Sequence, residues 1–192
     1  LPESSRIEYK FEVVRDGREE WILDPLNPLQ AVDPFGANSV AQGHGYQRPE
    51  WTLADPAARP GTLDGIALRS AALDDDRHVT VHLPARFPRS RRYPLLVVHD
   101  GGDYVAYAGL KTVLDNLIHR LEVADIVVAL THPGDRLHEY AAAPKHSAFI
   151  VDELVPFVER IAPIDPDPDK RGLMGSSFGA VAALATAYAH PG

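Results

Sequence analysis

The feature that most constrains the fold is residues 172–180, which contain the pattern Gly-x-Ser-x-Gly. The apolar pair Leu173-Met174 precedes this pattern, and an alanine-rich, helix-forming stretch follows it. This context is typical of a nucleophile elbow, the strand–turn–helix corner that lifts a serine hydroxyl above a sheet. The turn is tight, so it needs small residues such as Gly175 and Gly179. The sequence predicts Ser177 as a nucleophile; the simpler alternative is a glycine-rich turn with a solvent-facing serine.

From Gly61 onward, the apolar pattern alternates between the periods of strands and helices. We expect strands at Ile66–Leu73, His78–Leu83, Pro94–Val98 and Ile126–Leu130, and helices at Tyr107–Leu121, Phe149–Ile161 and Ala180–Ala189. The unbroken apolar runs favour parallel strands that are buried on both faces. Pro156 should start or kink its helix, and the apolar last helix should be buried on most sides. The fold class is therefore α/β, with right-handed crossovers.

The N-terminal part has a different pattern. Alternating residues over Ile7–Leu23 surround Asp16-Gly17, which predicts a β-hairpin with its turn there. The stretch Gln30–Gly61 is rich in Pro, Gly and Asn, and we interpret it as an ordered linker. The chain therefore divides into an N-terminal β domain with linker over residues 1–60 and an α/β domain over 61–192.

Composition narrows the function classes. The chain has 192 residues, 45% of them apolar, so it can form a sizeable core. A net charge of -8 disfavours nucleic acid or anionic membrane as the main partner. The absence of cysteine excludes disulfides, thiolate metal sites and a cysteine nucleophile. No apolar run is long enough to span a membrane, and no signal-peptide pattern appears. We expect a cytoplasmic protein, although a signal removed upstream of Leu1 stays open.

Three segments should meet at one edge of the sheet, because ligands bind beyond the carboxyl ends of parallel strands. They are residues 99–107, 131–145 and 175–179. A serine hydroxyl needs a histidine base and an orienting carboxylate to act as a nucleophile. The N–H of Phe178 should donate to the oxyanion of the intermediate. The second donor should come from Gly101, Gly102 or Asp103, with Gly102 favoured. No cofactor or metal is expected.

Nine histidines are present. His99, His132 and His138 follow strands on the site side, but none is predicted as the base. For His99 the simplest interpretation is a strand-end residue that is hydrogen-bonded within the oxyanion loop. His132 and His138 are interpreted as structural or substrate-facing.

Several motifs together resemble the enterochelin esterase branch of the α/β-hydrolases. They are Trp21–Pro28, Arg77–Pro84, Tyr93–Gly101, the Arg-x-x-Glu-Tyr run Arg136–Tyr140, Glu153–Pro156 and Gly175–Gly179. The resemblance implies an α/β-hydrolase three-layer sandwich preceded by a small β-sandwich domain. It also implies a serine carboxylic-ester hydrolase that works through an acyl-enzyme. Ala180 departs slightly from the family, in which a second Gly often follows the elbow.

The resemblance extends to the substrate, which would be the trilactone of an iron-loaded siderophore. Such a complex is anionic, and Arg136 would bind it; its simpler role is an ion pair with Glu139 or Glu153. Asp103, Tyr104 and His99 are weaker candidates for substrate contact. A carbohydrate or feruloyl esterase is the alternative enzyme, and a non-catalytic ligand-binding protein is the alternative outside enzymes.

The family places its catalytic acid and histidine after the strands that follow the elbow helix. Here the sequence ends at Gly192, so we expect the acid and the histidine beyond this point. We also expect the chain to be a fragment or clipped product that associates with its own C-terminal segment. Two further clusters are predicted to be surface features only: the basic group Arg86, Arg89, Arg91 and Arg92, and the acidic group Asp165, Asp167 and Asp169. The acidic group lacks the pattern of a calcium loop.

Overall fold

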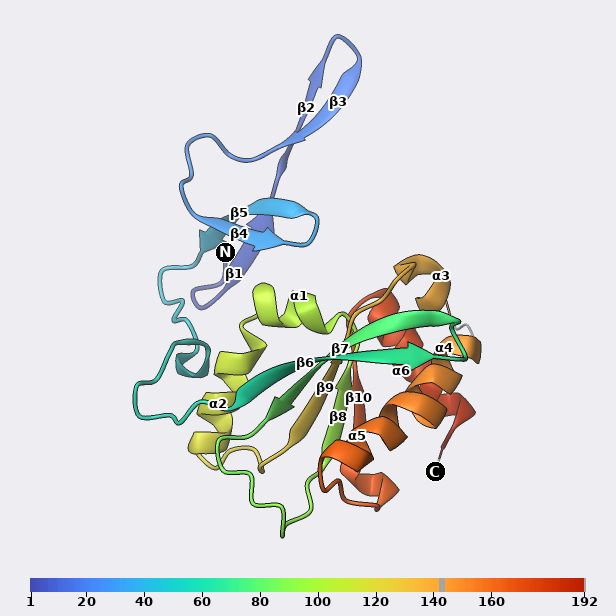
Figure 1. Ribbon diagram of the computed structural model, residues 1–192. Helices are drawn as coiled ribbons and strands as arrows, with labels where there is room; N and C mark the ends of the chain where they lie inside the picture. Colours follow the sequence, from blue (N-terminus) through green and yellow to red (C-terminus); the bar gives the residue numbers. More distant parts are fainter. Residues whose placement is uncertain (142–143, 192) are drawn as a thin grey trace. The chain divides into compact units, whose positions relative to one another are not determined.

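The computed structural model describes residues 1–141 and 144–191. It divides the chain into two compact units, Leu1–Thr52 and Leu53–Gly192 (Figure 1). The division falls at Thr52, before the expected boundary at residue 60. Residues just after it belong with the second unit because Asn116 donates a side-chain hydrogen bond of 2.7 Å to the carbonyl of Leu53.

The first unit contains only β-strands and short turns. A three-stranded antiparallel sheet has the order β1 (Arg6–Tyr9), β5 (Gly36–Gln42), β4 (Gln30–Asp33). The strands β2 (Phe11–Arg15) and β3 (Arg18–Ile22) form the predicted hairpin. Asp16 and Gly17 occupy its turn with φ values of 51° and 75°, which a right-twisted two-residue hairpin loop requires.

The prediction of a linker over residues 30–61 was wrong in its first half, which forms β4 and β5. These strands are short and largely polar, so their alternation is too weak to detect in the sequence. Pairing with β1, which lies far away in the sequence, stabilises them. The second half contains only the 3-10 turn η1 (Glu50–Thr52).

The second unit is built on a five-stranded sheet with helices, as the α/β class predicted, and the sheet is mixed. Its strands are β6 (Thr62–Ser70), β7 (Asp75–Leu83), β8 (Leu95–Val98), β9 (Val127–Thr131) and β10 (Arg171–Met174). They lie in the order β10-β8-β9-β7-β6, with β10, β8 and β9 parallel and β7 antiparallel to both of its neighbours. The carboxyl ends of the three parallel strands therefore lie at one edge.

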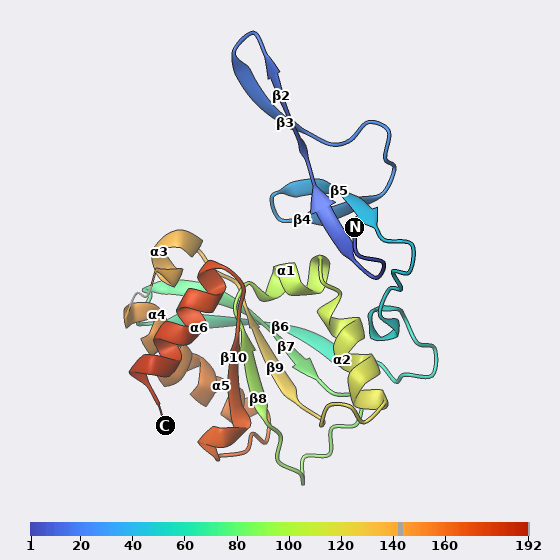
Figure 2. The ribbon, with the colours of Figure 1, turned by 180° about the vertical axis from the view of Figure 1, so that it is seen from behind.

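Helices cover both faces of this sheet (Figures 1 and 2). They are α1 (Gly101–Ala106), α2 (Leu110–His119), α3 (Arg136–Tyr140), α4 (Pro144–Ala148), α5 (Val155–Ile161) and α6 (Phe178–Ala189). One apolar core joins the sheet to α2 through Leu110 and Leu114. The larger core, on the other face, joins it to α5 through Val155 and Val158.

The structure corrects several expected boundaries. The strand expected at Ile66 starts at Thr62. The turn expected at His99–Asp103 is short and leads directly into helix α1. The helix expected over Tyr107–Leu121 is present as α2 and is shorter, because it begins only at Leu110 and ends at His119. The segment 132–145, expected to be irregular, contains α3 and the start of α4. These helices are only five or six residues long, and so short a helix shows too few turns for a periodic signal.

The helix expected at Phe149–Ile161 begins earlier, because α4 runs without a break through the π-helical segment η2 (Phe149–Leu154) into α5. Pro156 lies in the first turn of α5. Proline cannot donate an i to i−4 hydrogen bond, and the wider π turn accommodates it there.

Helix α6 begins two residues earlier than expected, and the prediction that it is mostly buried was wrong. Its buried residues lie on one side only, and Leu184 and Tyr188 are 73% and 91% exposed. No helix in the described parts of the chain has both the length and the apolar character needed to cross a membrane.

Candidate active site

The predicted elbow is present. Ser177 has φ 54° and ψ -123°, lies immediately before α6 and is exposed. This backbone conformation is strained for a residue with a Cβ. The turn brings Gly175 so close to Gly179 that a Cβ on Gly175 would lie 2.3 Å from the Gly179 carbonyl atoms. Glycine is therefore required at residue 175 by close backbone approach, as the sequence indicated.

The strand before the elbow pairs with the strand before the predicted oxyanion loop. Met174 at the end of β10 is opposite Val98 at the end of β8. The next amide, that of His99, donates a 2.9 Å hydrogen bond to the Met174 carbonyl. The two chain segments that leave these strands are therefore neighbours at the carboxyl edge of the sheet.

Unused backbone N–H groups are found in both segments. In the described structure, the amides of Phe178 and Gly102 have no acceptor, because each lies in the first turn of its helix. The Gly101 amide is also unpaired, but Gly101 is buried against Leu130. Asp103 is different, because its amide donates to the Asp100 carbonyl at 3.0 Å. Gly102 is therefore the better placed of the three predicted donors.

Asp100 occupies the turn between β8 and α1 with a left-handed φ of 55°. Its carboxylate accepts two hydrogen bonds from Arg136, Nε to Oδ1 at 2.8 Å and Nη2 to Oδ2 at 2.9 Å. The bond with Asp100 raises the pKa of the Arg136 guanidinium. Arg136 does not pair with Glu139 or Glu153, the partners considered from the sequence. The bidentate pair with Asp100 occupies two of the N–H donors of Arg136 and neutralises its charge. Arg136 is therefore a weak binding group for a substrate anion.

Tyr140 adds a second contact from α3 to the same turn. Its hydroxyl accepts a 3.2 Å hydrogen bond from the Asp100 amide. Burial raises the pKa of Tyr140 to about 12, so the phenol keeps its proton at neutral pH. The sequence analysis missed Asp100 and Tyr140. The signal was present in Arg136 and Tyr140, which are four residues apart and therefore share a face of a helix.

His99 is fully buried, and both ring nitrogens have partners within the chain. Its Nδ1 lies 3.2 Å from the Met174 carbonyl, and its Nε2 lies 3.0 Å from Nε2 of His146. Burial lowers the pKa of His99. His99 is a hydrogen-bonded strand-end residue, but its ring partners lie in β10 and α4 and not in the loop after β8, where they were expected. The weaker suggestion of substrate contact is not supported, because the ring is fully buried.

The other candidates lie nearer the surface. His132 is partly buried, with Nε2 3.1 Å from the Thr80 hydroxyl, and its ring lies against Gly102. Burial is the main cause of its lowered pKa. Tyr104 is half-buried against the α2 core, and Asp103 is partly exposed with no ion pair among the described residues. His138 is exposed, and its backbone amide donates to the Asp135 side chain, the N-cap of α3.

No described histidine forms a hydrogen bond with Ser177. His99 and His146 are paired with each other, and His132 is paired with Thr80. The described part of the chain therefore places the elbow and the loop with the predicted oxyanion donors at the same edge of the sheet, and no described histidine is hydrogen-bonded to Ser177 there.

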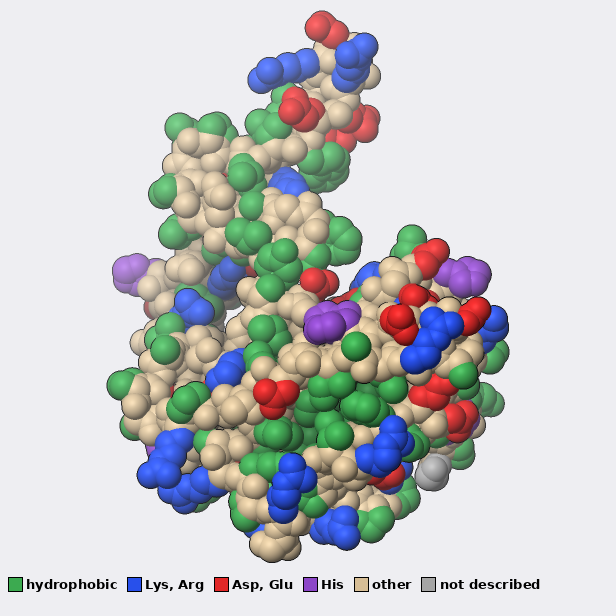
Figure 3. Space-filling view, viewed as in Figure 1, with side chains coloured by type: hydrophobic (Ala, Val, Ile, Leu, Met, Phe, Trp, Pro, Cys, Tyr) green, Lys and Arg blue, Asp and Glu red, His purple; other side chains and the backbone are tan. Residues whose placement is uncertain are grey.

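The clusters predicted as surface features lie away from this edge. Arg89 and Arg92 donate to backbone carbonyls and Arg91 pairs with Asp125, all near the amino ends of the parallel strands. Figure 3 shows several basic side chains at the surface of that end. Asp165 and Asp167 accept hydrogen bonds from backbone amides two residues later, so they form local turns.

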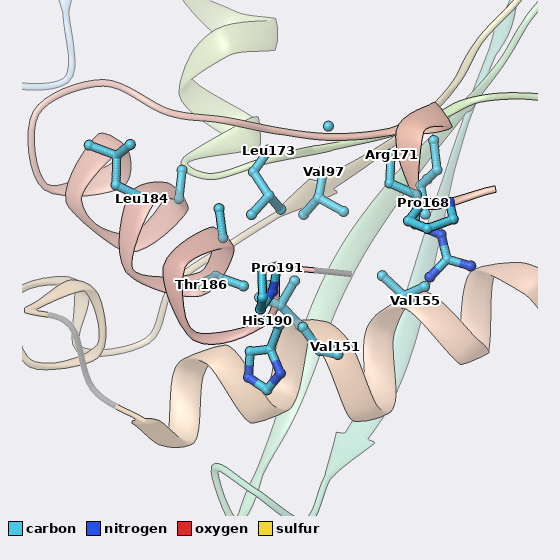
Figure 4. Close-up of a pocket in the computed structure, with 15 residues that line it drawn as sticks. Val97, Val151, Val155, Pro168, Arg171, Leu173, Leu184, Thr186, His190 and Pro191 are labelled. Atoms are coloured by element: carbon cyan, nitrogen blue, oxygen red, sulfur yellow. The ribbon is translucent and has the colours of Figure 1, made fainter. Parts of the chain in front are cut away.

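An apolar cavity of about 360 Å³ lies beside β10 and is separate from the elbow. Figure 4 shows its labelled lining residues, which include Val97, Val151, Val155, Leu173, Leu184 and Pro191. Neither Ser177 nor the predicted oxyanion donors line it. Strand β10 is at the edge of the sheet, and this cavity runs along it between α5 and α6.

Comparison with known proteins decides the family. Residues 70–192 match the model of the family Esterase, described as "Putative esterase". The chain belongs to this esterase family. The match begins at the last residue of β6 and covers β7 to β10, the loop after β8 and the elbow.

The chain is 27% identical over 179 residues to iron(III) enterobactin esterase of Escherichia coli K12, covering 87% of this chain and 44% of that protein. It is 25% identical to the uncharacterized protein YjcH of Bacillus subtilis, covering 70% and 59%. A crystal structure of enterobactin esterase from Shigella flexneri matches all of this chain and 55% of its own, with 25% identity and a TM-score of 0.80. The chain therefore has the α/β-hydrolase fold with an N-terminal β domain, and it spans about half the length of these relatives.

Proposed function

We propose that this chain supplies the nucleophile and oxyanion donors of a serine carboxylic-ester hydrolase. The observation that carries the proposal is the strained, exposed Ser177 at the start of α6, with the unused amide of Phe178 beside it. Strain of this kind persists only where the surrounding structure imposes it, and it is found at functional sites. Membership of the esterase family supports the same function.

In the proposed reaction, Ser177 Oγ attacks the ester carbonyl and forms a tetrahedral intermediate. The amides of Phe178 and Gly102 stabilise its oxyanion, and losing one such donor costs about 3 kcal/mol of activation free energy. The bond to the leaving alcohol then breaks, and a base returns the Ser177 proton to that alcohol. Water hydrolyses the acyl-enzyme by the same steps in reverse. We propose that this base and its carboxylate come from outside the 192 residues, because no described histidine contacts Ser177.

The substrate class is proposed from the relatives. Iron(III) enterobactin esterases support an ester of a siderophore. Arg136, which would bind such an anion, is held by Asp100, and this favours the alternative of a less charged ester such as a feruloyl ester. Ferulic acid esterases share the fold with this chain at TM-scores of 0.62 and 0.66. Hydrolysis rates with iron-loaded enterobactin and with methyl ferulate would decide between the two. A cytoplasmic location stays a prediction, which cell fractionation would test.

The test of the mechanism is covalent labelling with a fluorophosphonate, read as the intact mass of the denatured protein. The labelled protein has to include the segment that carries the proposed base, because Ser177 is not activated without it. In that protein we expect one adduct on the wild type, none on Ser177→Ala, and one on Ser176→Ala. Ser176 is the matched control because it is the adjacent serine of the same turn and is also exposed. An unlabelled wild-type protein that includes this segment would reject the hydrolase proposal and leave a ligand-binding protein. Adducts on all three proteins would show that the reactive group is elsewhere.

A further inference from the structure

Two buried histidines beneath the elbow have no part in the proposed reaction. His99 is at the end of β8 and His146 is in α4, and they are 0% and 2% exposed. Their Nε2 atoms lie 3.0 Å apart. A contact between two imidazole nitrogens is a hydrogen bond only if one carries a proton and the other does not. The pair therefore has a definite protonation pattern.

The Met174 carbonyl determines this pattern. A carbonyl oxygen can only accept, so Nδ1 of His99, 3.2 Å away, carries a proton. In neutral His99 the other nitrogen, Nε2, is then an acceptor, and Nε2 of His146 must donate to it. This leaves Nδ1 of His146 unprotonated. That atom is buried without a hydrogen-bond partner and lies 4.0 Å from the Glu139 carboxylate.

Both rings are kept neutral by their surroundings. Burial, with smaller contributions from His99 and Arg77, lowers the pKa of His146 to about 4. Arg77 is itself buried and holds Glu139 through two hydrogen bonds, of 3.0 Å and 2.8 Å. Because this pair neutralises the carboxylate, Glu139 attracts a proton to His146 only weakly.

The next residue of α4 contacts the other arm of the elbow. Ser147 and Thr186, both buried, have their hydroxyl oxygens 3.1 Å apart, and Thr186 belongs to α6. Consecutive residues of α4 therefore connect to both arms of the turn. His146 reaches the strand before Ser177 through His99, and Ser147 reaches the helix after it.

We propose that His146 is a positioning residue for Ser177: by donating to His99 it fixes the ring that holds the Met174 carbonyl. Met174 is the last residue of β10, and its carbonyl accepts from the His99 amide as well as from the His99 ring. Together these bonds hold the strand end from which the strained turn departs. The proposal rests on the proposed role of Ser177 for its functional meaning, but its structural content does not require the chain to be catalytic.

The first measurement determines which ring nitrogens of His99 and His146 carry protons. Long-range proton–nitrogen NMR spectra of the chain with 15N-labelled histidine distinguish the two neutral tautomers and the charged ring. We expect His99 protonated on Nδ1, His146 protonated on Nε2, and neither ring charged at pH 6. Protonation of His99 on Nε2 alone, or of His146 on Nδ1 alone, would overturn the proposal.

The second measurement compares His146→Leu with His146→Gln. Leu offers no donor to His99, whereas the Gln side-chain amide places an N–H near the position of the imidazole Nε2. We expect amide hydrogen exchange at Gly179, Ala180 and Val181, whose amides bond to the elbow carbonyls, to accelerate about tenfold in the Leu variant. In the Gln variant, exchange should stay close to that of the wild type. Equal exchange in the wild type and both variants would refute the positioning role.

His82 provides the matched control. It is also fully buried, with a ring nitrogen unpaired, but it contacts Asp115 on α2. His82→Leu should leave exchange at the elbow unchanged. If it accelerates elbow exchange as much as His146→Leu does, the effect is general destabilisation and the proposal fails. Failure of the hydrolase proposal is distinguishable, because it appears as an unlabelled wild-type chain while the tautomers and exchange rates remain measurable.

Discussion

At the scale of single residues, the ion pair between Asp100 and Arg136 shows how burial determines the contribution of such a pair to stability. Asp100 is 8% exposed and lies at a left-handed φ of 55°. Asp74 has nearly the same backbone, with φ 52°, and also pairs with an arginine, Arg69, but its side chain is 89% exposed. Solvent screens the second pair much more than the first.

We therefore predict that Asp100→Asn destabilises the chain much more than Asp74→Asn does. The first should lower the free energy of unfolding by about 2 kcal/mol, because it weakens charged hydrogen bonds in a partly buried site. The second should change it by less than about 0.5 kcal/mol. Asn tolerates a left-handed backbone, so neither substitution should add backbone strain. Urea unfolding measures the difference, and equal midpoints would show that the Asp100 pair contributes no more than a surface pair.

At the scale of elements, the elbow depends on the approach of α6 to the end of β10. Two glycines of this region test that dependence. A Cβ at Gly175 would meet backbone atoms of Gly179 at 2.3 Å, whereas a Cβ at Gly172 would meet only the side-chain end of Leu96 at 3.2 Å. Backbone cannot move aside locally, but a leucine methyl can.

Gly175→Ala should therefore destabilise the chain by more than about 2 kcal/mol and disrupt the turn that presents Ser177. Gly172→Ala, which lies within β10 before the turn, should lower the free energy of unfolding by less than about 1 kcal/mol. Urea midpoints together with the rate of fluorophosphonate labelling would check this. A Gly175→Ala chain that unfolds and labels like the wild type would contradict the close approach.

At the scale of the whole molecule, several buried histidines favour the neutral state. Burial lowers the pKa of His82, His99, His132 and His146 from the usual 6.5, in the case of His146 to about 4. All four lie in the second unit, and each favours the folded state most when it is neutral, although His99 and His146 are in contact and act as a pair. Below about pH 6.5 the unfolded chain binds more protons than the folded chain.

Stability should consequently be complete above pH 6.5 and fall as the pH drops toward the folded pKa values. Each imidazole contributes a slope of up to about 1.4 kcal/mol per pH unit in this interval. Urea unfolding between pH 7 and pH 5 measures this, and above pH 5 the titration of carboxylates interferes little. His146→Gln should have a shallower slope than the wild type. A free energy of unfolding that is independent of pH over this range would contradict the prediction.

Local patterns were sufficient for much of this fold. The apolar runs at β8 and β9, the Asp16-Gly17 turn and the Gly-x-Ser-x-Gly segment all carry their signal within a few residues, because strand burial, positive φ and a tight turn each demand particular side chains. The α/β class and the position of Ser177 followed from them.

Only the tertiary structure decided what Arg136 and His99 contact. Their partners, Asp100 and His146, lie 36 and 47 residues away in the sequence, and no local pattern specifies which charged or polar groups meet across such a distance. The short helices α3 and α4 bring them together, and packing against α6 rather than intrinsic propensity stabilises helices of this length. The sequence by itself therefore determined the class of sheet and the elbow. The network that supports the elbow depends on long-range packing, which determines burial and hence the protonation of its histidines.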